Sequence, residues 1–402
     1  MRRALSLAAF RRLALAYTLN EVGDWFATIA LTVLVFDRTG EALATAALFL
    51  STRFLPSLAV PFLASYAERG SVRVVLSIGY VAEALVFVLL AAAGADMALG
   101  VLCLVAMLDG TLAATARAVT RGATVAILEP AGQLREGNSL LNIGFSVVNV
   151  AAPATAGLAV AQLGAPGVLW IVAGIFLGLA VLMGTARGTP RGVRSTAPWT
   201  TRLREGFAYV RGHRIARGLL ALQAVLLVLF NIAVPIEVIY AKEVLDAGDI
   251  GFGALLAAWG GGMVAGSLLF ARLSQRSLAG LVIVSTVAVC AGYLGMAAAP
   301  NLLLACAAAA VGGLGNGVQW VAVITAIQEA IDDDMQARAA GMLEAVITAA
   351  PGLGFVVGGI LATVWDARTA FAVAGFGGLL VIAAAWLVWH RSDDAPPPQP
   401  AT

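Results

Sequence analysis

Five charged residues lie inside otherwise apolar stretches near the start of the chain. They are Glu21, Asp24, Arg53, Glu83 and Asp109. A charge at the centre of a membrane-like apolar region costs about 2.5 to 3.5 kcal/mol, so each should face protein or water and should have a partner. One arginine cannot neutralise four carboxylates. We therefore expect some of these acids to carry a proton, or to exchange one, near neutral pH.

The stretch that holds Glu21 and Asp24 has a single polar face. Tyr17, Asn20 and Thr28 fall in the same wedge as these two acids when the residues are placed about 100° apart on a helix. We expect this wedge to line a substrate cavity. The second half of the chain offers amide and aromatic side chains for the same cavity, namely Asn231, Asn316, Gln319 and Trp320.

Structural roles compete with these functional ones. Arg53 paired with Glu21 or Asp24 would fix how two helices pack, as buried ion pairs do in some proteins. Another arginine, Arg117, falls at the predicted cytoplasmic end of its helix, where we interpret it as an anchor whose side chain reaches the membrane surface. Aromatic residues within spans are more often packed against other helices or turned toward lipid than placed in a cavity.

The composition identifies the elements that must position these residues. The 402 residues are 60% hydrophobic and 12% charged, and segments such as 74–94 and 278–298 are apolar on every face, which is typical of membrane helices. A net charge of +2 argues against nucleic acid as a partner. No metal site, cofactor motif or catalytic constellation is recognisable, so we do not expect an enzyme.

Helices need about 20 apolar residues to cross the hydrocarbon core. The pattern predicts an all-α membrane protein with twelve transmembrane helices. Their predicted ranges are 13–36, 42–67, 74–94, 97–119, 138–163, 166–184, 219–240, 252–270, 278–298, 302–327, 339–364 and 369–389.

The basic residues give these helices an orientation. Most Lys and Arg fall on the side of both termini, and only Arg38, Lys242 and Arg368 fall on the other, so the termini are predicted to face the cytoplasm. The expected location is the cytoplasmic (inner) membrane, with the lipid bilayer as surroundings.

The predicted helices divide into two halves. Residues 1–184 would form one six-helix bundle and 218–390 the other. A cytoplasmic linker at 185–217 with an amphipathic helix joins them, and 391–402 is a disordered tail.

Short echoes relate the two halves. The motif AAPATAG, with Pro153, recurs as AAPGLG, with Pro351, and LDG around Asp109 recurs as GNG around Asn316. These matches predict two pseudo-symmetric bundles with an interface that encloses a substrate. We expect Pro153 and Pro351 to kink their helices.

Over nearly its whole length the chain resembles the major facilitator superfamily, and within it the branch of the enterobactin exporter and multidrug efflux proteins. The resemblance rests on four stretches, namely residues 10–40, 51–76, LREGFAYVRGH at 203–213 and the AAP motif at 151–153. The loop ASYAERGSVR resembles a degraded copy of the family's cytoplasmic gating loop GxLxDRxGRR, with Glu68, Arg69 and Arg73 in the charged positions.

This resemblance implies a secondary active transporter that works by alternating access as a monomer. The buried acids favour a proton-coupled exporter of a small amphipathic molecule, such as a drug, siderophore or secondary metabolite. The first half would carry the coupling and the second would contact the substrate. The alternatives are an importer or lipid transporter of the same fold, and a non-transporting membrane receptor or scaffold.

Overall fold

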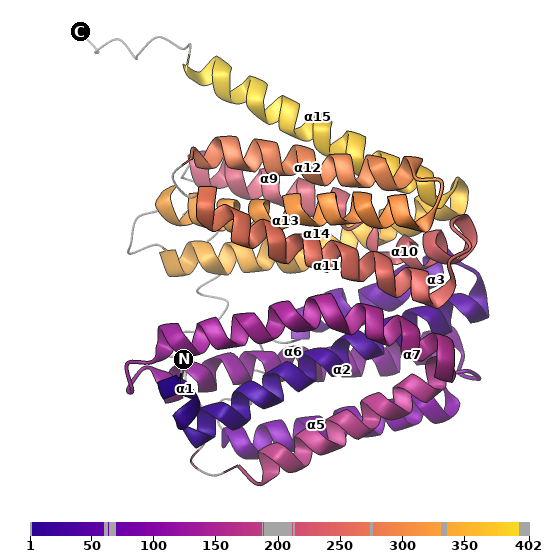
Figure 1. Ribbon diagram of the computed structural model, residues 1–402, viewed down its shortest axis with the longest axis vertical. Helices are drawn as coiled ribbons and strands as arrows, with labels where there is room; N and C mark the ends of the chain where they lie inside the picture. The colour runs from indigo at the N-terminus through magenta and orange to yellow at the C-terminus, as the bar shows by residue number, and fades with distance from the viewer. Residues whose placement is uncertain are drawn as a thin grey trace.

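The protein is built from helices (Figure 1). The computed structural model describes residues 2–59, 70–186, 214–273, 276–330 and 336–393, together with residues 63, 188 and 211. The helices of the first half are α1 (Arg2–Ser6), α2 (Ala8–Thr39), α3 (Ala42–Phe49), the π-helix η1 (Leu50–Phe54), α5 (Val72–Ala93), α6 (Leu99–Leu128) and α7 (Leu134–Gly184).

The second half begins with a segmented helix. It consists of α9 (Arg214–Phe230), the 3₁₀ turn η2 (Val234–Ile236), α10 (Glu237–Ile239) and the π-helix η3 (Tyr240–Val244). The remaining helices are α11 (Gly248–Leu273), α12 (Leu278–Ala298), α13 (Leu302–Ala330), α14 (Gln336–Val364) and α15 (Ala367–Asp393).

Eleven stretches of the described residues are long and apolar enough to cross a membrane. One of them, Glu136–Gly184, has 49 residues and would be roughly 75 Å long if straight, more than twice the thickness of the hydrocarbon core. It reverses at Gly164, whose φ of 71° is outside the helical region, and therefore holds two spans. The predicted all-helical fold with twelve spans is confirmed.

The spans form two bundles with their ends on common sides (Figure 1). In the first bundle α7 packs against α2 and α5, and in the second α13 packs against α11 and α12. We call the side where α2 begins and α15 ends the terminal side, and the other the opposite side. The predicted linker helix and the tail beyond residue 393 lie outside the described residues.

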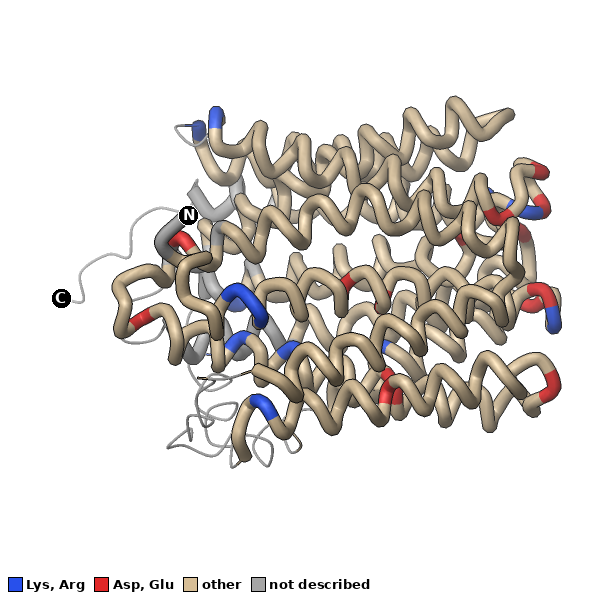
Figure 2. The backbone as a smooth tube through the Cα atoms, turned by 60° about the horizontal axis from the view of Figure 1, so that its bottom comes forward, with Lys and Arg blue, Asp and Glu red and all other residues tan. Residues whose placement is uncertain are grey.

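Most charged residues lie near the ends of the helices, on these two sides (Figure 2). The described Lys and Arg gather toward the terminal side, and most Asp and Glu of the loops lie on the opposite side. A few charged positions remain in the middle of the spans (Figure 2).

The second span changes its helical pitch at η1, and the sequence explains why. Pro56 has no N–H to donate to the carbonyl of Thr52, and its ring clashes with that carbonyl in a regular helix. The wider π turn from Leu50 to Phe54 relieves this conflict. Gly110 of α6 packs against the same place, where a Cβ would lie 2.9 Å from Cγ of Pro56. Only a glycine lets α6 approach so closely.

The two bundles meet through small residues. A Cβ on Gly157 of α7 would lie 2.9 Å from the Cα of Gly253 on α11, so the two helix backbones touch without intervening side chains. The other copy of the AAP motif also lies at the interface, because a Cβ on Gly352 would lie 2.7 Å from the ring of Phe54. Phe49 and Phe355 pack nearby, with ring centroids 5.6 Å apart.

Candidate functional site

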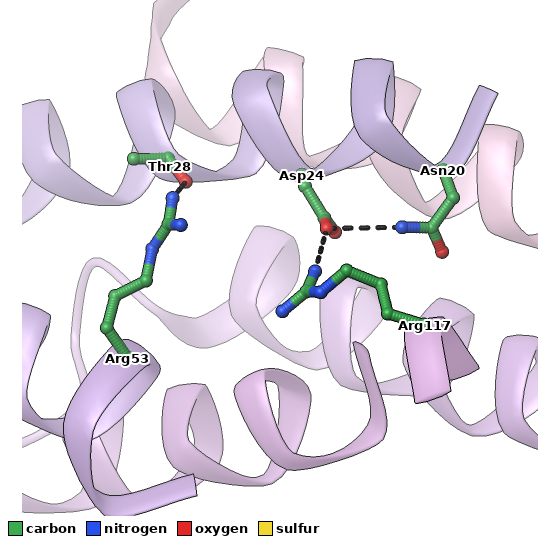
Figure 3. Close-up of polar contacts among 5 residues, drawn as sticks. All are labelled: Asn20, Asp24, Thr28, Arg53 and Arg117. Atoms are coloured by element: carbon green, nitrogen blue, oxygen red, sulfur yellow. Dashed lines mark hydrogen bonds and ion pairs between the residues drawn. The ribbon is translucent and has the colours of Figure 1, made fainter. Parts of the chain in front are cut away.

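The centre of the site is an ion pair between Arg117 of α6 and Asp24 of α2 (Figure 3). Nη1 of Arg117 donates a hydrogen bond of 2.6 Å to Oδ2 of Asp24, and the side chains are 32% and 17% exposed. Asn20 donates to the same oxygen at 3.1 Å. Asp24 lies at the middle of α2, so this pair is at the depth of the membrane centre.

The interpretation of Arg117 as a surface anchor is therefore wrong. It assumed that the span ended near residue 119, whereas α6 continues to Leu128. A stronger stop signal follows at Pro130 and Gly132. Counting back from that signal would have placed Arg117 well inside the helix and identified it as a second buried cation.

Arg53 does not form the ion pair expected of it. Its Nη2 donates to the hydroxyl of Thr28 at 3.3 Å (Figure 3). None of the described carboxylates, including Glu21 and Asp24, lies within 4.0 Å of its guanidinium group. The reason is competition, because Arg117 reaches Asp24 from the neighbouring helix. The side chain of Arg53 is exposed.

The other acids are buried. Glu83 of α5 is 0% exposed, Asp109 of α6 is 8% exposed, and Glu21 is 8% exposed. Both carboxylate oxygens of Glu83 and Oδ1 of Asp109 lack a hydrogen-bond partner in the part of the chain that the structure describes. The four acids Glu21, Asp24, Glu83 and Asp109 inside the spans are thus accompanied by two arginines, Arg53 and Arg117, instead of one.

A recess lies between α2, the second span and α6. It contains about 470 Å³ of space free of protein atoms, part of it open to solvent. Two acids and two arginines line it, together with threonine hydroxyls and an apolar wall. The lining residues are Asp24, Ala27, Thr28, Leu31, Thr32, Leu48, Phe49, Thr52, Arg53, Asp109, Gly110, Ala113 and Arg117.

Of the residues expected to line a substrate cavity, only Thr28 borders this recess. Tyr17 is half-buried, and Asn20 is buried and bonded to Asp24. In the second bundle, Gln319 is 4% exposed and donates to the hydroxyl of Thr286 at 3.1 Å, so it lies inside that bundle.

The remaining residues of the second bundle are half-buried and do not border the recess. Asn231 donates to the carbonyl of Leu227 at 2.7 Å, where α9 ends, and Asn316 and Trp320 are half-buried on α13. Gly317, next to Asn316, packs against the backbone of Ser267 on α11, as Gly110, next to Asp109, packs against the second span. Asn316 therefore occupies the position in the second bundle that Asp109 has in the first, without its charge.

The structure describes only some of the predicted gating and kink residues. Glu68 and Arg69 lie outside the described residues, and Arg73 is exposed near the start of α5. Pro153 and Pro351 lie within α7 and α14, which continue through them. The described residues hold no group of three or more His, Cys, Asp or Glu arranged to bind a metal ion.

These features define a membrane protein of two six-helix bundles with a charged recess at membrane depth. The sequence profile of the Major Facilitator Superfamily matches residues 13–276 and 219–402, so the chain belongs to this family of membrane transporters.

Solved structures agree with this fold. The nucleoside transporter NupG is 16% identical, with a TM-score of 0.79 over 95% of this chain and 99% of that one. A bacterial homolog of the human lysosomal transporter Spinster, in an inward-facing and unoccupied conformation, is 16% identical, with a TM-score of 0.74 over 97% and 98% of the two chains. A bacterial homologue of the iron transporter ferroportin, in an inward-facing state, is 17% identical, with a TM-score of 0.71 over 95% and 98%. No curated protein sequence matches the chain significantly.

Proposed function

We propose that the protein is a proton-coupled exporter of a small amphipathic molecule that works by alternating access. The observation that carries this proposal is the Arg117–Asp24 pair at the border of a recess that also holds Asp109. Inside the spans of the first bundle the four acids Glu21, Asp24, Glu83 and Asp109 outnumber the arginines Arg53 and Arg117, so protons are the simplest means of balancing the excess negative charge.

The pair offers a way to couple proton binding to conformation. A proton on Asp24 removes the negative charge that holds Arg117, and losing one member of a buried pair costs about 3 to 5 kcal/mol. Because Asp24 is on α2 and Arg117 on α6, this change alters how two helices of the first bundle pack. A substrate that enters the recess would be sensed by the same groups.

Two further points support the direction and the energy source. The sequence contains no nucleotide-binding P-loop motif, which favours an ion gradient as the source of energy. The stretches from Phe10 and Ser51 resemble the exporter branch of the family. The basic terminal side in Figure 2 supports a cytoplasmic location for the termini in the inner membrane.

Reconstitution in liposomes tests this function. We would impose a pH gradient and follow the movement of amphipathic fluorescent dyes and the release of protons, for the natural protein and for Asp24→Asn. We expect the gradient to drive dye movement against its concentration in the natural protein, and the variant to permit only movement down the dye gradient. Equal gradient-driven transport by both proteins would refute the role of Asp24.

A further inference from the structure

The charged residues that line the recess are two acids and two arginines, Asp24, Asp109, Arg53 and Arg117. Asp24 and Arg117 satisfy each other at 2.6 Å. The other two acids of the bundle, Glu21 and Glu83, are buried and do not border the recess. One acid and one arginine therefore remain to face any molecule that enters.

Arg53 is the arginine that remains. A guanidinium group has five N–H donors, and among the described residues Arg53 makes one hydrogen bond, to Thr28 at 3.3 Å. No described carboxylate lies within 4.0 Å of it, and its side chain is exposed at the recess. The π turn of η1, required by Pro56, sets the direction from which this side chain enters. Planar groups of this kind bind carboxylates and phosphates through two parallel hydrogen bonds.

Asp109 is the acid that remains. Its side chain is 8% exposed, and no described residue donates a hydrogen bond to its Oδ1. The next residue, Gly110, brings α6 against Thr52 and Pro56, which holds Asp109 beside the helix turn that carries Arg53. Buried oxygens are nearly always hydrogen-bonded, so an unsatisfied one in a recess indicates a missing donor.

We propose that the recess binds a zwitterion, with an ammonium group of the ligand at Asp109 and a carboxylate or phosphate group at Arg53. The two protein charges are opposite, share one recess and are not bonded to each other, so a ligand with both charges satisfies both. A singly charged ligand leaves one of them uncompensated at membrane depth. The apolar part of the ligand packs against Leu31, Leu48 and Phe49.

This inference rests on the proposed function, since it takes the recess to be the substrate site. It is also consistent with exchange, because an ammonium group and a proton are alternative occupants of the Asp109 carboxylate. Binding of one therefore displaces the other.

Matched ligands test the proposal. The probes are phenylalanine, tryptophan and alanyl-phenylalanine, each compared with its methyl ester, which lacks the anion, and its N-acetyl derivative, which lacks the cation. Affinities are measured by calorimetry and by the thermal stability of the purified full-length protein. We expect at least one zwitterion to bind about ten-fold more tightly than either of its derivatives, as befits the loss of one charge-assisted hydrogen bond.

Two variants assign the two groups. In Arg53→Gln the zwitterion and its ester should bind within about two-fold of each other, while the N-acetyl derivative remains weaker. In Asp109→Asn the preference over the N-acetyl derivative should disappear instead. Arg272→Gln, which removes an exposed arginine of α11, is the control and should keep both preferences. Circular dichroism and gel filtration establish that each variant is folded.

The outcomes separate this inference from the proposed function. If esters bind as well as zwitterions, or if no compound of the set binds, the inference is overturned, while gradient-driven dye transport can still establish an exporter. If both preferences appear and change in the two variants as described, the inference stands even where no gradient drives transport. Loss of both preferences together in both variants would mean a general collapse of the recess and would also overturn it.

Discussion

The ammonium group of Lys242 donates a hydrogen bond of 2.5 Å to Oδ1 of Asp37, although the two residues belong to different bundles. The same nitrogen lies 2.8 Å from Oδ1 of Asp249 at the start of α11. Lys242 of η3 thus links the end of α2 and the start of α11 on the opposite side. Figure 1 shows that the bundles converge on this side and diverge toward the terminal side. The link to Asp37 must break before the opposite side can open.

We predict that Asp37→Asn shifts the protein toward conformations open on the opposite side. Asp37 is 52% exposed, so the contact is worth little, and the ratio of the two states should change by about two- to five-fold. Spin labels at Arg11 and Arg272, both exposed, would report a shorter distance on the terminal side in a larger fraction of molecules.

Asp249→Asn is the matched control, because it removes an ion pair to the same lysine within a single bundle. Its effect on the distance distribution should be smaller, and high salt should reduce the effect of Asp37→Asn. Equal shifts in the two variants would show that the charge of Lys242 matters and its link to Asp37 does not.

Breaking the central ion pair should destabilise the protein. Arg117→Leu leaves Asp24 without its cation, so we expect the free energy of unfolding to fall by roughly 3 kcal/mol. The double variant Asp24→Leu with Arg117→Leu should recover part of this loss, because no unpaired charge remains. Unfolding in mixed micelles measures both. A double variant that is less stable than Arg117→Leu alone would contradict this account.

The contact between α6 and the second span depends on Gly110. A methyl group there would meet the backbone of Thr52 and the ring of Pro56, so Gly110→Ala should separate the helices, lower the melting temperature and impair transport. Gly79→Ala on α5 is the control, because a methyl group there meets nothing within 4 Å. It should be neutral or stabilising by up to about 1 kcal/mol. Similar melting temperatures for the two variants would argue against a tight contact at Gly110.

Gln319 should have a structural effect only. Gln319→Leu removes the donor to Thr286 inside the second bundle, and we expect about 1 to 3 kcal/mol of destabilisation. The ranking of ligands by affinity should not change, since the residue does not border the recess. A changed ranking of affinities in competition assays would instead indicate that Gln319 contacts the substrate.

The sequence was sufficient for the membrane fold, because apolar length and turn signals are local properties. It also placed the acids inside spans, since counting from span ends needs no tertiary information. Their part in proton exchange stays a prediction. The partners of these acids were less accessible, because Arg53 and Arg117 both reach toward α2 and only packing decides which of them meets Asp24.

The location of Arg117 was wrong because the end of its helix was placed too early. The predicted ion pair of Arg53 was wrong as a consequence. Once Arg117 was assigned to the membrane surface, Arg53 remained as the sole partner for Asp24. The direction of Gln319 was also beyond the sequence, because an amide on an apolar helix faces a cavity or a neighbouring hydroxyl with equal ease.

We expect the bare backbone contact of Gly157 with Gly253 to be the point about which one bundle tilts on the other during alternating access. The nearest atoms to a Cβ at either glycine belong to the backbone of the other helix, so side chains should offer little resistance to a change of angle at this contact. A tilt of about 10° around this point moves the far end of a 30 Å span by roughly 5 Å. A substitution that adds even a methyl group at either glycine would push the two helices apart at this contact. It would thereby change how far the helix ends move when one bundle tilts on the other.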